Sequence, residues 1–352
     1  MRKLLLGVSL TLFAVAAQAE ELEYVGEFRL PTGIKIDGVE IGGLSALEYD
    51  PASGTFLALS DDLAQYGPAR FYEIALDLSA KGIRGVDIRR RVDLKDLEGE
   101  AYAPRSLDPE GLRLASGATL FWSHERDEAG VPFVGEMTRD GRATRRFELP
   151  EYYAPTSDGA VGTRTNLGFE ALTVRDGVVV AGMENAMKQD GPEASLSEGS
   201  PARVLTFATE TGAPMAEYVY VTERVPARPS PATGFHTNGL VELLARAEGG
   251  FYALERAFSA GQGNTVRIFI TRFEGATNVL GTPSLLEVDY QPMPKELLFT
   301  LQAGGIADTI DNLEGMTFGP EIDGARTLVL VSDNNFNPNG QFTQFLLFKI
   351  IE

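Results

Sequence analysis

Acidic side chains recur in this 352-residue sequence beside short apolar segments, at comparable places along the chain. Carboxylate and amide oxygens are the ligands that Ca²⁺ prefers, and the ion takes about 6–8 of them. We therefore predict a calcium site built from these recurring acids and one amide. Its expected ligands are Asp61, Glu110, Glu170, Glu314, Asp333 and Asn335, and further acids of the same recurring set are Asp62, Glu184, Glu242 and Glu255.

Arginines follow several of these acidic clusters: Arg70, Arg126, Arg256 and, less regularly, Arg164. A guanidinium group binds phosphate through two parallel hydrogen bonds. With a metal ion neutralising the carboxylates, a phosphate ester could lie between metal and arginine, where a metal-bound water would attack it. The alternative is that these arginines pair with neighbouring acids as structural bridges. On the catalytic interpretation the expected residues are Asp61, Asp62, Arg70, Glu170, Glu255, Arg256 and Glu314.

The segment 333–340 alternates oxygen-bearing side chains, with Asp333, Asn335, Asn337 and Asn339 followed by Gly340. This is the spacing of a calcium loop, but a proline at 338 stands where an EF-hand requires glycine. Both a metal loop and a cluster of Asx turns remain open for this segment.

Other chemistries find little support. The chain has no cysteine and two histidines, His124 and His236, so disulfides, thiolate metal sites and a three-histidine zinc site are excluded. It contains no Gly-x-Ser-x-Gly sequence, no phosphate-binding P-loop and no dinucleotide fingerprint. His124 is expected at a solvated strand end and His236 in a proline-rich loop, with a functional role as the alternative for each.

The acids lie at the ends of paired apolar strands that recur five times, over residues 44–62, 110–126, 170–185, 238–256 and 314–335. A glycine-containing turn separates the two strands of each pair, at 53–54, 116–117, 176–177, 249–250 and 323–324. Weaker alternating strands follow. The starts are about 60–75 residues apart, which is typical of the blades of a β-propeller. We predict an all-β propeller whose polar residues converge on one axis. The alternative role for Glu110, Glu170 and Glu314 is to bond the backbone of the neighbouring blade and so lock the ring.

The two ends of the chain predict how the ring closes. The last repeat lacks one strand, which residues 24–30 could supply and so protect two free edges. We predict five four-stranded blades, with six as the alternative because 273–300 is long for one strand and a loop. Segments 152–165, 188–201 and 225–237 are expected to be loops, either at a functional face or at the surface.

The N-terminal residues have the features of a secretory signal. Arg2 and Lys3 precede an apolar stretch, and residues 17–19 form a small-x-small cleavage site. The alternative to a signal peptide is a membrane anchor, but the apolar stretch falls short of the roughly 20 residues that an anchor needs. We expect cleavage near Ala19, a single domain over 20–352, and a periplasmic or secreted protein without a membrane span.

The chain is strongly acidic, with a formal charge of −19 that becomes −21 once Arg2 and Lys3 are removed. Such a charge argues against nucleic acid, whose phosphates need a basic surface. It either serves solubility alone or concentrates metal cations.

Four segments together resemble the phytase-like family, described by its esterase-like activity of phytase. They are 60–72, 166–173, 254–267 and 311–336, which run in order across nearly the whole predicted mature chain. The resemblance implies an exported β-propeller that hydrolyses phosphate esters or other esters. Because function depends on sites rather than on folds, the fold is the firmer of these two implications.

The sequence therefore leaves three functional hypotheses open. The first is a Ca²⁺-dependent hydrolase of small phosphate esters with its site on the propeller axis. The second is a non-catalytic propeller that binds a ligand or a protein, with calcium in a structural role. The third, a metal-independent carboxylesterase, ranks last because no nucleophile lies beside an activating base. A monomer is favoured.

Overall fold

The structure is a computed structural model that describes residues 20–115 and 119–352. The predicted signal peptide and the predicted turn at 116–117 lie outside these residues. No helix in the described part of the chain has the length and hydropathy needed to cross a membrane.

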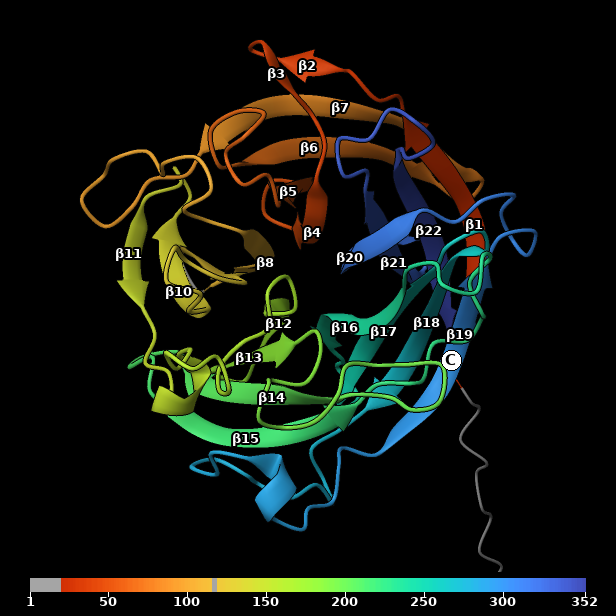
Figure 1. The fold of residues 1–352 in the computed structure, drawn as a ribbon. Coiled ribbons are helices and arrows are strands. Elements are labelled where there is room, and N and C mark those ends of the chain that lie inside the picture. Colours follow the sequence, from red (N-terminus) through yellow and green to blue (C-terminus); the bar gives the residue numbers. More distant parts are fainter. Residues whose placement is uncertain (1–19, 116–118) are drawn as a thin grey trace, which may run out of the picture.

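The described residues form five four-stranded antiparallel sheets arranged as blades around a common axis (Figure 1). The predicted five-bladed propeller is confirmed. From the axis outward, the blades contain β4 (Leu44–Asp50), β5 (Thr55–Ser60), β6 (Arg70–Ser79) and β7 (Gly82–Asp93); β8 (Pro109–Leu114), β9 (Thr119–His124), β10 (Phe133–Thr138) and β11 (Ala143–Arg146); β12 (Phe169–Arg175), β13 (Val178–Met183), β14 (Pro201–Ala208) and β15 (Pro214–Val221); β16 (His236–Ala245), β17 (Phe251–Ser259), β18 (Gly263–Thr271) and β19 (Lys295–Gln302); and β20 (Asn312–Ile322), β21 (Ala325–Asp333), β22 (Thr343–Ile351) and β1 (Glu21–Leu30).

The smaller elements lie outside the blades. A short hairpin pairs β2 (Lys35–Ile36) with β3 (Val39–Glu40). Two short 3₁₀ turns occupy Glu151–Tyr153 and Leu285–Glu287. The second turn falls inside the long segment 273–300, which contributes loop and one outer strand rather than a sixth blade. The six-bladed alternative is therefore wrong.

The ring is closed by the two ends of the described chain. Strand β1 pairs antiparallel with β22, from Glu21 opposite Ile351 to Leu30 opposite Thr343. The prediction that residues 24–30 complete the last blade is thus confirmed. Closure gives both terminal strands a hydrogen-bonding partner, which removes two edges that could otherwise pair with another chain.

The hydrophobic core lies between successive blades. Between the third and fourth blades, for example, Val180 and Val204 pack in one cluster with Leu240, Leu243 and Ala253, all of them buried. Inner strands are buried on both faces because each blade is covered by its two neighbours. In the outer strand β7, residues 86–89 alternate between partly buried and exposed, as the sequence pattern predicts.

Each inner strand carries a β-bulge near its start. The pairing register shifts between Leu44 and Ala46, and at the matching place in β8, β12, β16 and β20. A bulge inserts an extra residue and redirects its side chain. In three of the five inner strands that residue is a glutamate, namely Glu110, Glu170 or Glu314.

The side chain of Arg113, on β8, fills the middle of the ring. Its terminal nitrogens donate hydrogen bonds to carbonyl oxygens of three other inner strands, those of Leu47 in β4 (3.0 Å), Leu243 in β16 (3.3 Å) and Met316 in β20 (3.2 Å). One side chain reaches four inner strands because it lies on the axis. It therefore blocks the centre of the propeller and leaves a pocket on one side.

Two glutamates complete what we call the axial ion cluster, defined as Arg113, Glu48 and Glu242. Glu242 lies 2.6 Å from Arg113 and accepts a hydrogen bond from the backbone N–H of Leu172 in the neighbouring blade (3.1 Å). Glu48 accepts one from the N–H of Leu114, also in a neighbouring blade (3.1 Å). The cluster thus links all five inner strands.

Candidate functional site

An open cavity of about 780 Å³ lies on the axis, at the end where inner strands begin and second strands end. We call it the acidic pocket. Arg256 is the one basic residue among the described residues that line it. The acids lining it are Asp61, Glu110, Glu170, Glu184, Asp311, Glu314 and Asp333.

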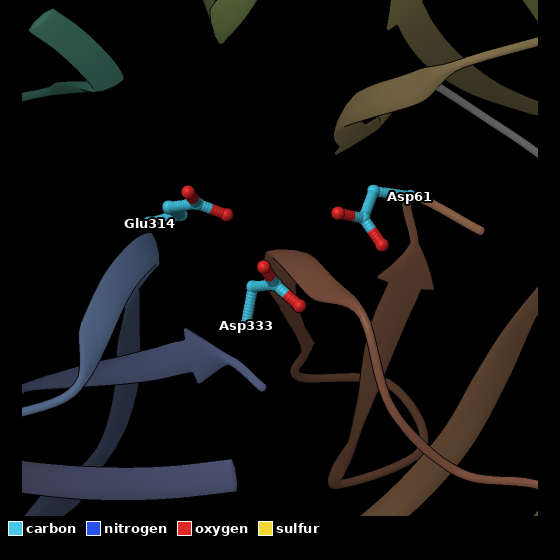
Figure 2. Close-up of side chains that lie close together, drawn as sticks. All are labelled: Asp61, Glu314 and Asp333. Carbon is cyan, nitrogen blue, oxygen red and sulfur yellow. The ribbon is translucent and has the colours of Figure 1, made fainter. Parts of the chain in front are cut away.

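Three groups of carboxylates lie close enough to share cations. Asp61, Glu314 and Asp333 direct oxygens toward one point, and these oxygens lie within 4.8 Å of one another (Figure 2). Carboxylate oxygens also lie within 4.8 Å of one another in two further groups around the pocket, Asp108–Glu110–Glu125 and Glu125–Glu170–Glu184. The structure therefore brings together the five acids of the predicted metal set, but distributes them over three neighbouring groups.

Local backbone geometry places these side chains. Asp61 and Glu184 directly follow the second strands β5 and β13. A β-carbon on Gly43 would lie 2.1 Å from an oxygen of Asp61, and one on Gly239 would lie 2.2 Å from an oxygen of Glu184. Only glycine fits at either position while the carboxylate keeps its place. Gly43 also has a φ of 64°, which glycine adopts readily.

Asparagine side chains and backbone amides hold the first group in place. Asn312 Nδ2 donates to Glu314 Oε1 at 2.9 Å and to Asp333 Oδ2 at 3.2 Å. The N–H of Asn335 donates to Asp333 Oδ1 at 2.6 Å. This last bond is an Asx turn, so Asn335 has the turn geometry foreseen as one alternative, while it also lines the pocket.

Burial and mutual repulsion raise the pKa values of these acids. Burial, followed by the charges of Asp333 and Glu314, holds the pKa of Asp61 well above its usual range. Burial and the neighbouring Glu314 raise the pKa of Asp333 to about 8. For Glu184, burial outweighs the attraction of Arg256 and raises the pKa to about 7. So many carboxylates cannot all be ionised together unless cations compensate them.

Several buried polar atoms of the site have no hydrogen-bond partner among the described residues. They include Oε2 of Glu125, a residue that is 1% exposed, Oδ1 of Asn264, and Nε of Arg256. Buried polar atoms are almost always satisfied in folded proteins. The acceptors fit a divalent cation, and the donor fits an anion.

Arg256 occupies the place that acids occupy in other blades. It lies opposite Gly239 on the inner strand, as Asp333 lies opposite Asn312. Its Nη2 donates to Glu314 Oε1 at 2.9 Å and lies 3.7 Å from Glu184 Oε1. Burial alone would lower its pKa, but the carboxylates outweigh burial and raise it, so the side chain stays charged.

Glu255, predicted as catalytic, does not line the pocket. Its carboxylate accepts hydrogen bonds from Tyr220 Oη (2.8 Å), Asn238 Nδ2 (2.8 Å) and Lys295 Nζ (2.7 Å), and so joins the fourth blade to the third. It precedes Arg256 by one residue. Since successive strand side chains face opposite ways, Arg256 faces the pocket and Glu255 faces the neighbouring blade.

Asp62 and Arg70 also lie outside the pocket lining. Arg70 is fully buried, with Nη1 at 2.6 Å from Asp62 Oδ2. Its other hydrogen bonds go to Tyr72 Oη and to the carbonyls of Pro68 (3.0 Å) and Glu40 (3.1 Å). These bonds leave Arg70 with the structural role that was the alternative for the arginines, rather than a phosphate-binding role.

The other basic candidates are engaged elsewhere. Arg164 donates to the carbonyls of Ala186 and Gly191, and so supports its loop. Arg126 lies 3.1 Å from Asp108 and donates to Asn166 at the edge of the pocket (3.2 Å).

Neither histidine is placed for catalysis. The expectation of a solvated His124 is wrong, because this side chain is buried against Trp122 and Phe133. His236 Nδ1 lies 3.2 Å from the carbonyl of Gly234.

Sequence reasoning missed three carboxylates of the site and misassigned one role. Asp311 lines the pocket, and Asp108 and Glu125 belong to the carboxylate groups. Glu125 directly precedes Arg126, and Asp108 lies two residues before Glu110. Bonding between blades was the alternative role for Glu110, Glu170 and Glu314. The structure gives that role to Glu48 and Glu242 of the axial ion cluster.

The fold and pocket define a class: a five-bladed propeller with an axial acidic site. The sequence profile of the phytase-like family, described as having the esterase-like activity of phytase, matches residues 39–336. The chain belongs to this family. No curated protein sequence matches it.

Solved propeller-containing structures show distant similarity. A GH32 β-fructofuranosidase from Bombyx mori matches at 10% identity with a TM-score of 0.40, over 94% of this chain and 62% of that protein. An N-acetylgalactosamine deacetylase from F. plautii matches at 10% identity with a TM-score of 0.45, over 94% and 95% of the two chains. A glycoside hydrolase candidate from Parabacteroides distasonis matches at 8% identity with a TM-score of 0.46, over 91% and 92%. At these TM-scores the similarities carry no conclusion about function.

Proposed function

We propose that this protein is a metal-dependent hydrolase of phosphate esters, with Ca²⁺ as the preferred ion. One observation carries the proposal. Around one pocket lie buried acceptor oxygens without donors, in Glu125 beside the lining acids and in Asn264 of the lining, and a buried arginine nitrogen without an acceptor, in Arg256. A cation together with a phosphate group would satisfy both kinds of atom.

The chain offers a defined set of residues for each part of such a substrate complex. Asp61, Glu314 and Asp333 would hold the cation, since hard oxygen donors suit Ca²⁺. A bound divalent cation would polarise the phosphate group and lower the pKa of a coordinated water. Arg256 would donate to phosphate oxygens, and its bond to Glu314 keeps the guanidinium oriented.

A proton acceptor is also available. Glu184 lies 3.7 Å from Arg256, and Glu170 belongs to the same carboxylate group. A carboxylate within reach of the attacking water can take its proton as a general base. Glu110, in the adjoining group with Asp108 and Glu125, would add an oxygen ligand and negative charge that favour cation binding.

The direct test is an assay of the purified chain from residue 20 on p-nitrophenyl phosphate, p-nitrophenyl acetate and phytate. Each substrate is measured with Ca²⁺ and with chelator. We expect phosphatase activity that chelation abolishes, and loss of that activity in Asp61→Asn and Asp333→Asn. Unchanged rates in both variants would remove these residues from the site.

A non-catalytic propeller with structural calcium is the second candidate. The observation in its favour is that no histidine, and no serine beside a base, is among the described residues lining the pocket. Thermal stabilisation by Ca²⁺ without turnover of any ester would support this candidate over the hydrolase.

We also propose that the protein is exported and acts as a monomer. In support, Glu20 accepts a hydrogen bond from Arg246 (2.8 Å) and β1 begins at the next residue, so cleavage after Ala19 would preserve the closing strand. N-terminal sequencing of the periplasmic fraction and of the medium, together with size-exclusion chromatography with light scattering, tests these points. A chain that retains residues 1–19, or a stable dimer, would contradict them.

A further inference from the structure

Part of the wall of the acidic pocket is apolar. Phe235, Phe258, Leu167, Ile310 and Phe342 line the same cavity as the carboxylates. Phe235 is 69% exposed, whereas Asp333 is 1% exposed. The aromatic residue therefore lies toward solvent and the carboxylate lies deeper in the pocket.

The strand geometry places an aromatic ring beside Arg256, the only basic residue among the described residues that line the pocket. Arg256 and Phe258 are two residues apart in β17, so their side chains share one face, about 7 Å apart along the strand. Phe235 extends this aromatic surface, with its ring centroid 6.2 Å from that of Phe258. A ligand whose phosphate group contacts Arg256 would thus place its alcohol portion against these two rings.

Backbone hydrogen bonds hold Phe235 in this exposed position. The N–H of Ala260 donates to the carbonyl of Phe235 (2.9 Å), and the N–H of Ser230 donates to the carbonyl of Ala260 (2.7 Å). Ser259 Oγ donates to the carbonyl of Ala227 in the same loop (2.8 Å). An exposed apolar ring that is already ordered loses little conformational freedom when a ligand packs on it.

The charges of the pocket limit the number of phosphate groups that it can accept. Arg256 is the single basic side chain among its described lining residues, against seven acids. A ligand with many phosphates would leave most of them facing carboxylates. One phosphate group, compensated by a cation and by Arg256, fits this balance.

We propose that the substrate is a monoester that joins a single phosphate group to an aromatic or bulky apolar alcohol, rather than an inositol polyphosphate. This inference rests on the proposed function. Hydrolysis breaks the bond between phosphorus and the ester oxygen and forms one between phosphorus and the oxygen of water. One proton of that water goes to the leaving alcohol, and the other remains with the phosphate. Phe235 and Phe258 hold the alcohol portion and determine specificity.

The experiment compares benzyl phosphate with ethyl phosphate, whose leaving alcohols have similar acidity, in the presence of Ca²⁺. Binding of the non-hydrolysable benzylphosphonate, ethylphosphonate and phytate is measured in parallel by calorimetry. The variant is Phe235→Ala, and Phe235→Tyr should preserve its role. The matched control is Leu286→Ala, because Leu286 is 74% exposed and lies outside the pocket lining.

We expect kcat/KM and affinity to favour the benzyl compounds by about tenfold, equivalent to ~1.4 kcal/mol. Phe235→Ala should remove most of this preference and leave the ethyl compounds unchanged, while Phe235→Tyr and Leu286→Ala retain it. Equal binding of the two phosphonates, tighter binding of phytate, or an equal loss for both esters in Phe235→Ala would overturn the inference.

Binding and turnover separate this inference from the proposed function. If benzylphosphonate binds more tightly than ethylphosphonate and this difference depends on Phe235, but neither ester is hydrolysed, the proposed ligand class is supported and the hydrolase function is excluded. Turnover of both esters at equal kcat/KM would support the hydrolase and remove the ligand class.

Discussion

Two groups of charged side chains lie on the propeller axis, and their charges are balanced in opposite ways. In the axial ion cluster, one arginine is paired with Glu242 at 2.6 Å and its terminal nitrogens bond to carbonyls of the inner strands. In the acidic pocket, Arg256 faces several carboxylates. The Nε of each arginine has no partner within the described residues, but only beside the pocket is a carboxylate oxygen, Glu125 Oε2, also without a donor. The first group supports the ring, whereas the second is the site proposed to bind a ligand.

The comparison shows how residues of one type acquire different roles. Glutamates of the axial ion cluster accept backbone N–H groups of neighbouring blades, so they stabilise the fold without further partners. Burial raises the pKa values of glutamates in both groups, but Arg113 opposes the rise in the axial ion cluster, whereas neighbouring carboxylates add to it in the pocket. Concentrated like charge destabilises a folded protein unless a ligand compensates it, and sites with this property are typically functional.

The largest effect is expected where Arg113 is removed. Arg113→Met would leave the buried Glu242 without its cation and several carbonyls without donors. We expect the free energy of unfolding to fall by about 3–5 kcal/mol, measured by chemical denaturation. The control is Arg89→Met, whose exposed ion pair should contribute less than about 1 kcal/mol. A fully stable Arg113→Met protein would refute the structural role of the axial ion cluster.

Replacing Arg256, the arginine of the acidic pocket, should mainly lower kcat. In Arg256→Met we expect kcat to fall by about 100- to 1,000-fold, as on loss of a donor to developing charge. Steady-state kinetics with Ca²⁺ measures this, with Arg89→Met again as the control. Retention of full activity would show that Arg256 does not contact the substrate.

Neutralising one glutamate in each group should change stability in opposite directions. In chelator at pH 8, Glu184→Gln should raise the free energy of unfolding by about 1 kcal/mol, because it relieves repulsion between buried carboxylates. Glu242→Gln should lower it by about 1–3 kcal/mol, since it weakens the bond to Arg113. If both variants changed the free energy of unfolding in the same direction, the contrast between the axial ion cluster and the acidic pocket would be contradicted. Calcium affinity should fall in Glu184→Gln and persist in Glu242→Gln.

A smaller effect should appear in the dependence of stability on pH. The pKa values of Glu184 and Asp333 are raised to about 7 and about 8 in the folded protein, above their ordinary values of 4.5 and 3.8. The unfolded chain therefore loses these protons first, and the metal-free protein should lose stability as pH rises from about 4 to about 8. Thermal melts in chelator measure this loss, and saturating Ca²⁺ should suppress it. If the stability of the metal-free protein increased over this pH range, the raised pKa values of Glu184 and Asp333 would be excluded.

Several features of the protein could be predicted from sequence because they depend on local periodicity. The five repeats, the wet outer strands and the closing strand at residues 24–30 follow from alternation and from one missing strand. The pocket acids Asp61, Glu110, Glu170, Glu314 and Asp333 were found because they recur at matching positions.

Other assignments depended on details that repeat spacing does not contain. Glu255 and Arg256 are adjacent in sequence, but the bulge in β16 and the strand register decide which of them faces the pocket. Arg70 follows an acidic cluster like the other candidates, yet it is buried against Asp62. Whether such a side chain meets a ligand or a structural partner depends on segments distant in the chain.

The amino-acid sequence by itself determined the propeller, its closure and the acidity of its axis, because apolar alternation and charge are properties of short segments. Only the tertiary structure decided which charges compensate one another. Arg113 meets carbonyls from three other blades, whereas Arg256 meets an excess of carboxylates. The physical reason is that pairing requires distances of about 3 Å between residues that ring closure alone brings together.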